Sequence, residues 1–136
     1  MNKYEKLLEE AHKNDVSVDE NYRFTGQTSG LYIDGNIALS DKLNTTAAKS
    51  CILAEELGHH HTSYGNILDL SDSGNQKQEY QARVWAYNHQ LGLKSIISAY
   101  EHHCRNRFEV AEYLDVTEEF LEDAIAYYRG KYGTCV

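Results

Sequence analysis

The sequence of 136 residues contains no proline and only three cysteines. The cysteines form an odd, widely spaced set without a CxxC pair: Cys51, Cys104 and Cys135. This pattern argues against a disulfide framework and against a thiolate zinc knuckle. We therefore expect reduced thiols. The absence of proline leaves no rigid linker, and the chain shows no internal repeat or low-complexity tract.

Long apolar runs are also missing, because no stretch approaches the roughly 18 residues that a membrane span needs. The N-terminal segment MNKYEKLLEEAHK is charged and amphipathic, and it lacks the apolar core and the cleavage site of a secretory signal. These features predict a cytoplasmic protein that does not contact a membrane. Basic residues are outnumbered, with 13 Lys and Arg against 21 Asp and Glu. The formal net charge of −8 opposes binding to phosphate backbones, so we do not expect a nucleic-acid partner.

The length is that of one domain that can bury a core without disulfide or metal staples. Within it, we predict a core over residues 1–92 and a helical C-terminal module over residues 93–136 that packs on the core. Residues 2–13 show helical apolar spacing, and Val16 and Val18 alternate with polar residues as in a short strand or an extended link. Asp34-Gly35 separates two β-prone runs, LYI and IAL, and predicts a β-hairpin with a type I′ turn.

The rest of the chain reads as a series of helices. A long helix begins after a cap at Asn44 or Thr45 and continues to about residue 62, and residues 65–75 form a loop. A further helix is predicted over about 76–91, and Gly92 caps its C-terminal end. A shorter helix is predicted within 95–106, and residues 107–133 show a helix-turn-helix pattern. Thr117 opens the last helix, and Gly130 and Gly133 close it.

The long helix carries the stretch LAEELGHHH, which contains an H-E-x-x-H motif altered in its first letter. Residues four apart share a helix face, so Glu55 and His59 can bind one ion together. Glu56 then occupies the position of the general base in H-E-x-x-H metalloproteases. The other register, with Glu56 and His60 as ligands, places Leu57 in the base position, and leucine cannot accept a proton. Without further residues, the stretch is more typical of a helix C-terminus with histidines near the negative end of the helix dipole.

Glu79, in the next predicted helix, supplies a third ligand, because a catalytic zinc takes three protein ligands and one water. Ala82 and Ala86 follow it at i+3 and i+7, and small residues on that face allow two helices to approach closely. The predicted ligands are Glu55, His59 and Glu79. Two carboxylates shift the metal preference of such a site from zinc toward manganese or iron.

Taken in order, GLYIDGNIAL, AEELGHHH and KQEYQARVWAY resemble the ImmA/IrrE family of small zincin-like metallo-endopeptidases of bacteria, prophages and other mobile elements. The resemblance covers roughly residues 1–91. It implies an α+β, mostly helical zincin-like fold with a small hairpin or sheet beside the metal helix, followed by a C-terminal helix-turn-helix-like module. It also implies zinc as cofactor, His59 and Glu79 as ligands, Glu56 as general base, and Glu55 at the position of the family's first histidine.

The predicted activity is cleavage of a peptide bond by metal-activated water, and the resemblance implies a helix-turn-helix repressor as the substrate. The alternative is a catalytically inactive or metal-free regulatory module that binds a repressor. His60 is either a second-shell residue or a solvent-exposed histidine. The runs LYI and IAL are candidate edges for binding an extended substrate, or else a purely structural hairpin. Residues 105–131 contain more acidic than basic residues, which favours packing or protein recognition over DNA binding.

Overall fold

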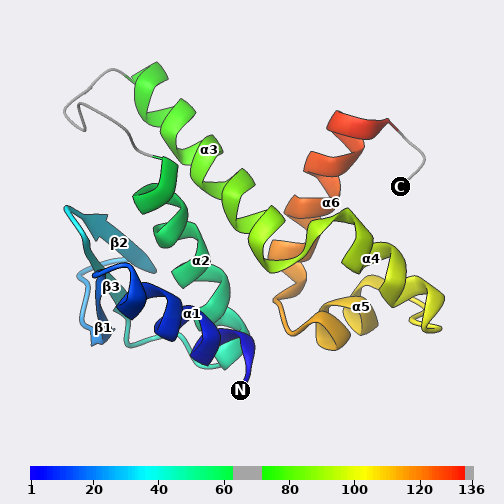
Figure 1. Ribbon diagram of the computed structural model, residues 1–136, viewed down its shortest axis with the longest axis horizontal. Coiled ribbons are helices and arrows are strands. Elements are labelled where there is room, and N and C mark those ends of the chain that lie inside the picture. Colours follow the sequence, from blue (N-terminus) through cyan, green and yellow to red (C-terminus); the bar gives the residue numbers. More distant parts are fainter. Residues whose placement is uncertain (63–71, 134–136) are drawn as a thin grey trace.

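The computed structural model describes residues 1–62 and 72–133, and its fold is α+β and mostly helical, as predicted (Figure 1). The elements follow the order α1 (Lys3–Lys13), β1 (Ser17–Tyr22), β2 (Gly30–Ile33), β3 (Asn36–Ser40), α2 (Thr46–Thr62), α3 (Asp72–Gln90), α4 (Gly92–Glu101), α5 (Arg107–Leu114) and α6 (Glu118–Tyr132). Among the described residues, no helix is long and apolar enough to cross a membrane.

The predicted hairpin is confirmed. Asp34 and Gly35 have φ values of 52° and 83°, the positive values that a type I′ turn requires, and β2 pairs antiparallel with β3. The sheet also has a third strand, because β1 pairs parallel with β3 in the strand order β1-β3-β2. Since β3 is the central strand, the run IAL is wrong as a free edge, whereas LYI in β2 does lie at an edge of the sheet.

Local signals set most helix ends correctly. The Thr45 hydroxyl accepts a hydrogen bond from the Ala48 amide, so Thr45 rather than Asn44 caps α2, and the Thr117 side chain caps α6 as predicted. Three expectations were wrong. Helix α4 spans Gly92–Glu101, so it begins and ends earlier than the predicted stretch 95–106. Helix α3 begins at Asp72, inside the predicted loop, and Gly130 lies within α6 rather than at its end. The remainder of the predicted loop, over residues 65–71, falls outside the described residues.

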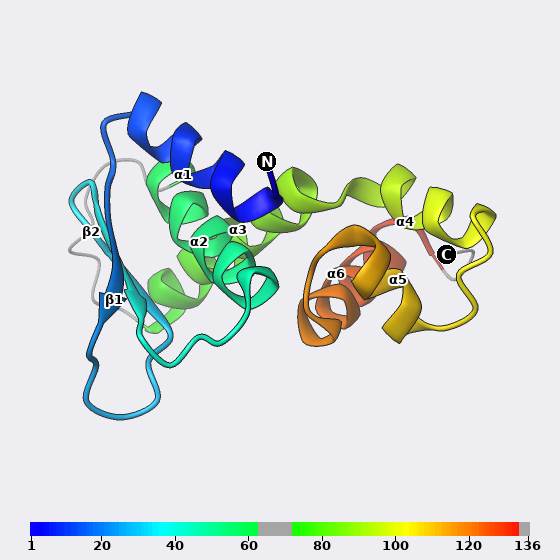
Figure 2. The ribbon, with the colours of Figure 1, turned by 90° about the horizontal axis from the view of Figure 1, so that it is seen from below.

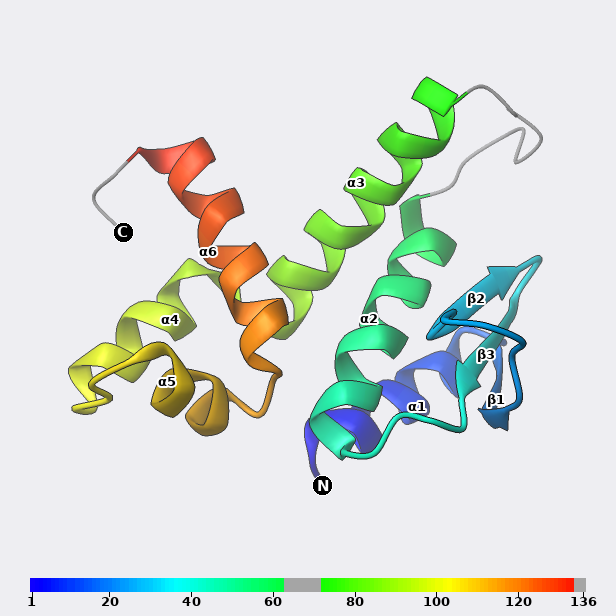
Figure 3. The same ribbon diagram turned by 180° about the vertical axis from the view of Figure 1, so that it is seen from behind.

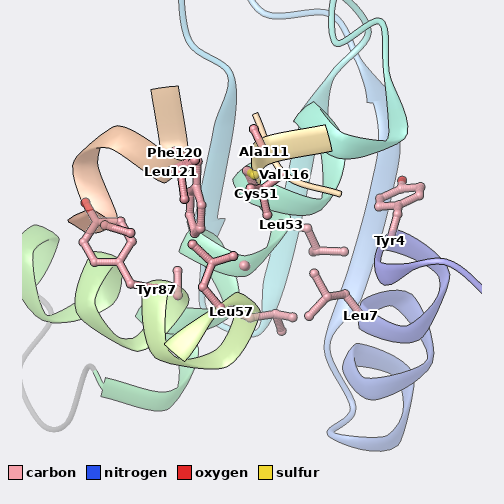
Figure 4. Close-up of a cluster of buried hydrophobic side chains, with 14 of the residues drawn as sticks. Tyr4, Leu7, Cys51, Leu53, Leu57, Tyr87, Ala111, Val116, Phe120 and Leu121 are labelled. Atoms are coloured by element: carbon pink, nitrogen blue, oxygen red, sulfur yellow. The ribbon is translucent and has the colours of Figure 1, made fainter. Parts of the chain in front are cut away.

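One apolar core connects the N-terminal and C-terminal helices. Figure 4 shows Leu7 of α1, Leu53 and Leu57 of α2, Tyr87 of α3 and Leu121 of α6 in a single cluster of buried side chains. In the other views, the sheet lies on one side of α1–α3 and the helices α4–α6 on the other (Figures 2 and 3). Helix α2 is therefore flanked by the edge strand and by the C-terminal helices. The division at residues 92 and 93 stays a prediction.

The turn between α5 and α6 depends on a left-handed residue. Asp115 has φ 57° and ψ 46°, at a position where such turns prefer glycine. Because a non-glycine residue in this region costs about 1–2 kcal/mol, we expect Asp115→Gly to raise the free energy of unfolding by about 1 kcal/mol. Urea denaturation followed by circular dichroism measures this change. Asp115→Asn is the control for the lost charge, and it should change the free energy of unfolding very little. A lower free energy of unfolding for Asp115→Gly than for wild type would contradict the prediction.

Candidate functional site

The first part of the site is the contact between α2 and the edge strand β2. Gly30 opens β2 directly beside Glu56, since a Cβ atom built on Gly30 would lie 3.0 Å from Glu56 Oε2 and 2.6 Å from Ile52 Cγ2. No side chain fits at position 30 without displacing these groups. The absence of a side chain therefore lets the strand lie against the helix turn that carries the predicted general base.

The second part is the crossing of α2 and α3. Gly58 packs directly against the α3 backbone, because a Cβ atom there would lie 2.3 Å from the carbonyl oxygen of Ala82. Ala82 and Ala86 are buried at 1% and 0% exposure, which confirms the predicted close approach of the two helices. This approach brings His59 Nε2 within 3.1 Å of Glu79 Oε1. Two of the three predicted ligands are thus in contact across the helix pair.

Glu55, the third predicted ligand, lines a cavity of about 380 Å³. The walls of this cavity come from α2, α3, the N-terminal half of α6 and Ser29, the residue before β2. The charged residues of its lining are Glu55, Arg83 from α3, and Glu119 and Asp123 from α6. The C-terminal helices therefore form one side of the candidate site.

Negative charge accumulates around these groups. Burial raises the pKa of Glu56 to about 8, and the charges of Glu55 and Glu79 add to the shift. Burial likewise raises the pKa of Glu55 to about 7, against the opposing effect of the Arg83 guanidinium and with the support of Glu79. Both carboxyl groups are thus poorly solvated as anions. A cation placed among them would lower both pKa values and stabilise the charged forms.

The predicted ligands fit a divalent metal by the chemistry of their donors, one imidazole nitrogen and two carboxylates, in a site with excess negative charge. The His59–Glu79 contact provides one preformed half of such a site. In residues 1–62 and 72–133, however, no three His, Cys, Asp or Glu side chains come together closely enough to hold an ion. Binding would therefore require the Glu55 side chain to turn toward the His59–Glu79 pair.

The neighbouring histidines anchor the end of α2. His60 Nδ1 lies 2.7 Å from the Tyr32 hydroxyl of β2, and His60 is half-buried, so its interpretation as a solvent-exposed histidine is wrong. His61 stacks on Trp85 of α3, with ring centroids 4.8 Å apart, and Trp85 stacks on His89. These contacts join α2 to both the sheet and α3. His60 supports the strand beside Glu56 and remains a candidate second-shell residue.

A larger cavity, of about 580 Å³, lies beside α3 between the end of α2 and Tyr127 of α6. It is lined by none of the predicted ligands and not by Glu56, so its size alone does not make it the candidate site. The smaller cavity is lined by one of these residues, Glu55.

Sequence reasoning did not identify Gly30, Arg83 or the α6 carboxylates as part of the site, and it included Tyr32 only in the candidate edge LYI. Gly30 and Tyr32 fall in the predicted hairpin, and the alternation of its residues was a usable signal for which side chains face α2. Arg83 follows Glu79 by four residues, which was also detectable as a shared helix face. Glu119 and Asp123 carried no such signal, because only the packing of α6 brings them to the cavity.

Over residues 6–125, the chain matches the sequence model of the IrrE N-terminal-like domain, a peptidase family. The matched region begins in α1 and ends in α6, so it includes β2, both helices of the candidate site and the α6 wall of the cavity. No curated protein and no solved structure matches the chain.

Proposed function

The chain belongs to the ImmA/IrrE family of peptidases, and from this membership we propose that it is a metal-dependent endopeptidase whose site is formed by Glu55, Glu56, His59 and Glu79. The observation that carries the proposal is the 3.1 Å contact between His59 and Glu79 across the α2–α3 crossing. A family match alone does not require these two residues to meet.

Each residue has a role set by its position. Glu55, His59 and Glu79 would hold the metal, with zinc as the expected ion and manganese or iron as alternatives. The metal, when bound, would polarise the scissile carbonyl and acidify an attacking water. Glu56 accepts a proton from that water and passes it to the leaving amine. His60 and Tyr32 keep β2 beside Glu56.

The edge strand provides a place for an extended peptide. Ser40 donates a backbone hydrogen bond to Ser29, and hydrogen-bonded pairs alternate along an antiparallel ladder. The backbone groups of Leu31 and Ile33 are therefore directed toward β3, whereas those of Gly30 and Tyr32 are directed toward the open edge. A substrate added as a further strand would bond to Gly30 and Tyr32 directly beside Glu56.

We further propose a helix-turn-helix repressor as the substrate and the cytoplasm as the location. The support for both is the family resemblance, together with the acidic charge of the chain, which disfavours nucleic acid as the ligand. The alternative is a module that binds a repressor without cutting it. One observation favours this alternative, since no three potential ligands converge within the described part of the chain.

Metal binding is the first test. Titration calorimetry with Zn²⁺ and with Mn²⁺ should show about one ion per wild-type chain. Glu79→Ala should weaken the binding by at least about 100-fold, because even outer-shell partners of ligands contribute about 10- to 100-fold. Glu101→Ala, which removes an exposed carboxylate of α4, is the matched control and should bind as wild type does. Equal affinities of Glu79→Ala and wild type would remove Glu79 from the site.

Cleavage separates the two candidate functions. The metal-loaded protein is incubated with each helix-turn-helix repressor encoded in the same genome, and the products are identified by mass spectrometry. A new pair of fragments that together account for the repressor supports the endopeptidase. A stable complex without fragments, under each of the three metals, supports the binding module instead.

A further inference from the structure

The Arg83 guanidinium is a cation beside the candidate metal site. Arg83 follows Glu79 by one helical turn on α3, so both residues lie on the same face of the helix. It lines the cavity that also contains Glu55. Within the described residues, Arg83 makes no direct ion pair with a carboxylate, although arginines 23, 105 and 107 each do.

All the other charged residues that line this cavity are acidic. Apart from the guanidinium, the charged groups that line the cavity are Glu55, Glu119 and Asp123. Glu55 is the half-buried member of this set, and the other two carboxylates are exposed on α6. Since Arg83 and Glu55 line one cavity, the guanidinium attracts the Glu55 carboxylate across it.

We propose that Arg83 is an internal counter-cation for Glu55 and thereby determines how tightly the Glu55–His59–Glu79 site binds a divalent metal. The assignment of the three ligands rests on the proposed function, whereas the role of Arg83 goes beyond it. Two effects of the Arg83 charge both weaken metal binding. The attraction between Glu55 and the guanidinium competes with metal binding, and the guanidinium repels the divalent ion across the cavity.

The same relation accounts for a glutamate in the position of the first histidine. A carboxylate at position 55 is attracted to Arg83, but a neutral imidazole would not be. Glu55 and Arg83 carry opposite charges and line the same cavity, so an attractive charge faces the third proposed ligand when no metal is bound. The other two proposed ligands, His59 and Glu79, contact each other.

The test is the affinity for Zn²⁺ and for Mn²⁺, measured by titration calorimetry on the whole chain. Arg83→Gln should bind each metal about 10-fold more tightly than wild type, because a unit charge of the same sign is removed from the neighbourhood of a divalent ion. Arg83→Lys keeps the charge and should remain within about threefold of wild type on the same grounds. Arg107→Gln removes an arginine of α5 that pairs with Glu122, and it should not change the affinity.

Arg83 is exposed, so the substitutions should leave the fold intact, and circular dichroism checks this. Equal or weaker metal binding by Arg83→Gln would overturn the proposal, as would an Arg83→Lys variant that binds as tightly as Arg83→Gln. If these variants and wild type bind the metal equally, the proposed function stands and only the role of Arg83 fails. If neither wild type nor Arg83→Gln binds any metal, both are overturned.

Discussion

Replacing Glu56 by glutamine should lower kcat for peptide-bond cleavage by about 10²- to 10⁴-fold, the contribution that a positioned general base makes. Glutamine has nearly the shape of glutamate but cannot accept a proton from water. Its side chain fits in the same space beside Gly30. The metal affinity should stay near that of wild type, because Glu56 is not one of the three proposed ligands. Cleavage of the repressor, followed by gel and mass spectrometry, measures the change.

The pH dependence of stability shows whether Glu56→Gln is correctly folded. In the metal-free protein the pKa of Glu56 is raised to about 8 by burial, above the value of about 4.3 in an unfolded chain. Folding therefore favours the protonated form, and the ionised carboxylate lowers stability increasingly as the pH rises from about 4 to 8. Metal-free Glu56→Gln should match wild type near pH 4 and exceed it in stability at pH 8. Full cleavage activity in this variant would exclude Glu56 as the base.

Replacing Gly58 by alanine should lower the free energy of unfolding by about 3 kcal/mol, at the upper end of the range for overpacked cores. The added Cβ atom would lie 2.3 Å from the carbonyl oxygen of Ala82 and 3.0 Å from its Cα. Backbone atoms cannot move aside as a flexible side chain can, so α2 and α3 must separate. Since His59 is the next residue, the His59–Glu79 contact should be lost at the same time, and the metal affinity should fall with the stability.

Gly130 provides the matched control for this substitution. It lies within α6, and a Cβ atom there meets nothing within 4 Å. Gly130→Ala should therefore raise stability by about 0.5–1 kcal/mol, because alanine loses less conformational entropy in a helix. Urea denaturation of both variants measures the difference. A Gly58→Ala protein as stable as wild type would show that the two helices do not cross at this point.

The local elements were largely predictable. The alternation around Asp34-Gly35 predicted the hairpin, and the Thr117 cap and the apolar spacing predicted α6. These signals depend on residues within a few positions of one another, through turn geometry and side-chain bonds to the backbone. The parallel pairing of β1 with β3 was missed because it joins separate segments through backbone groups that carry no sequence signature.

The candidate site was predictable only in part. Helical spacing placed Glu55 and His59 on one face, and it required Glu56 rather than Leu57 in the base position. The small residues Ala82 and Ala86 correctly indicated a close helix pair, and Glu79 does contact His59 across it. The assignment of all four residues to catalysis and metal binding remains a prediction.

The sequence by itself determined most of the helices, the hairpin and the membership of a peptidase family, because each depends on residue type and short spacing. Only the tertiary structure decided what surrounds Glu55. Packing of α6 against α2 places Glu119 and Asp123 in its cavity, and the α2–α3 crossing places Arg83 there. The electrostatic environment of a carboxylate depends on which charged groups lie near it in space. The spacing of those groups along the sequence does not predict that they lie close together.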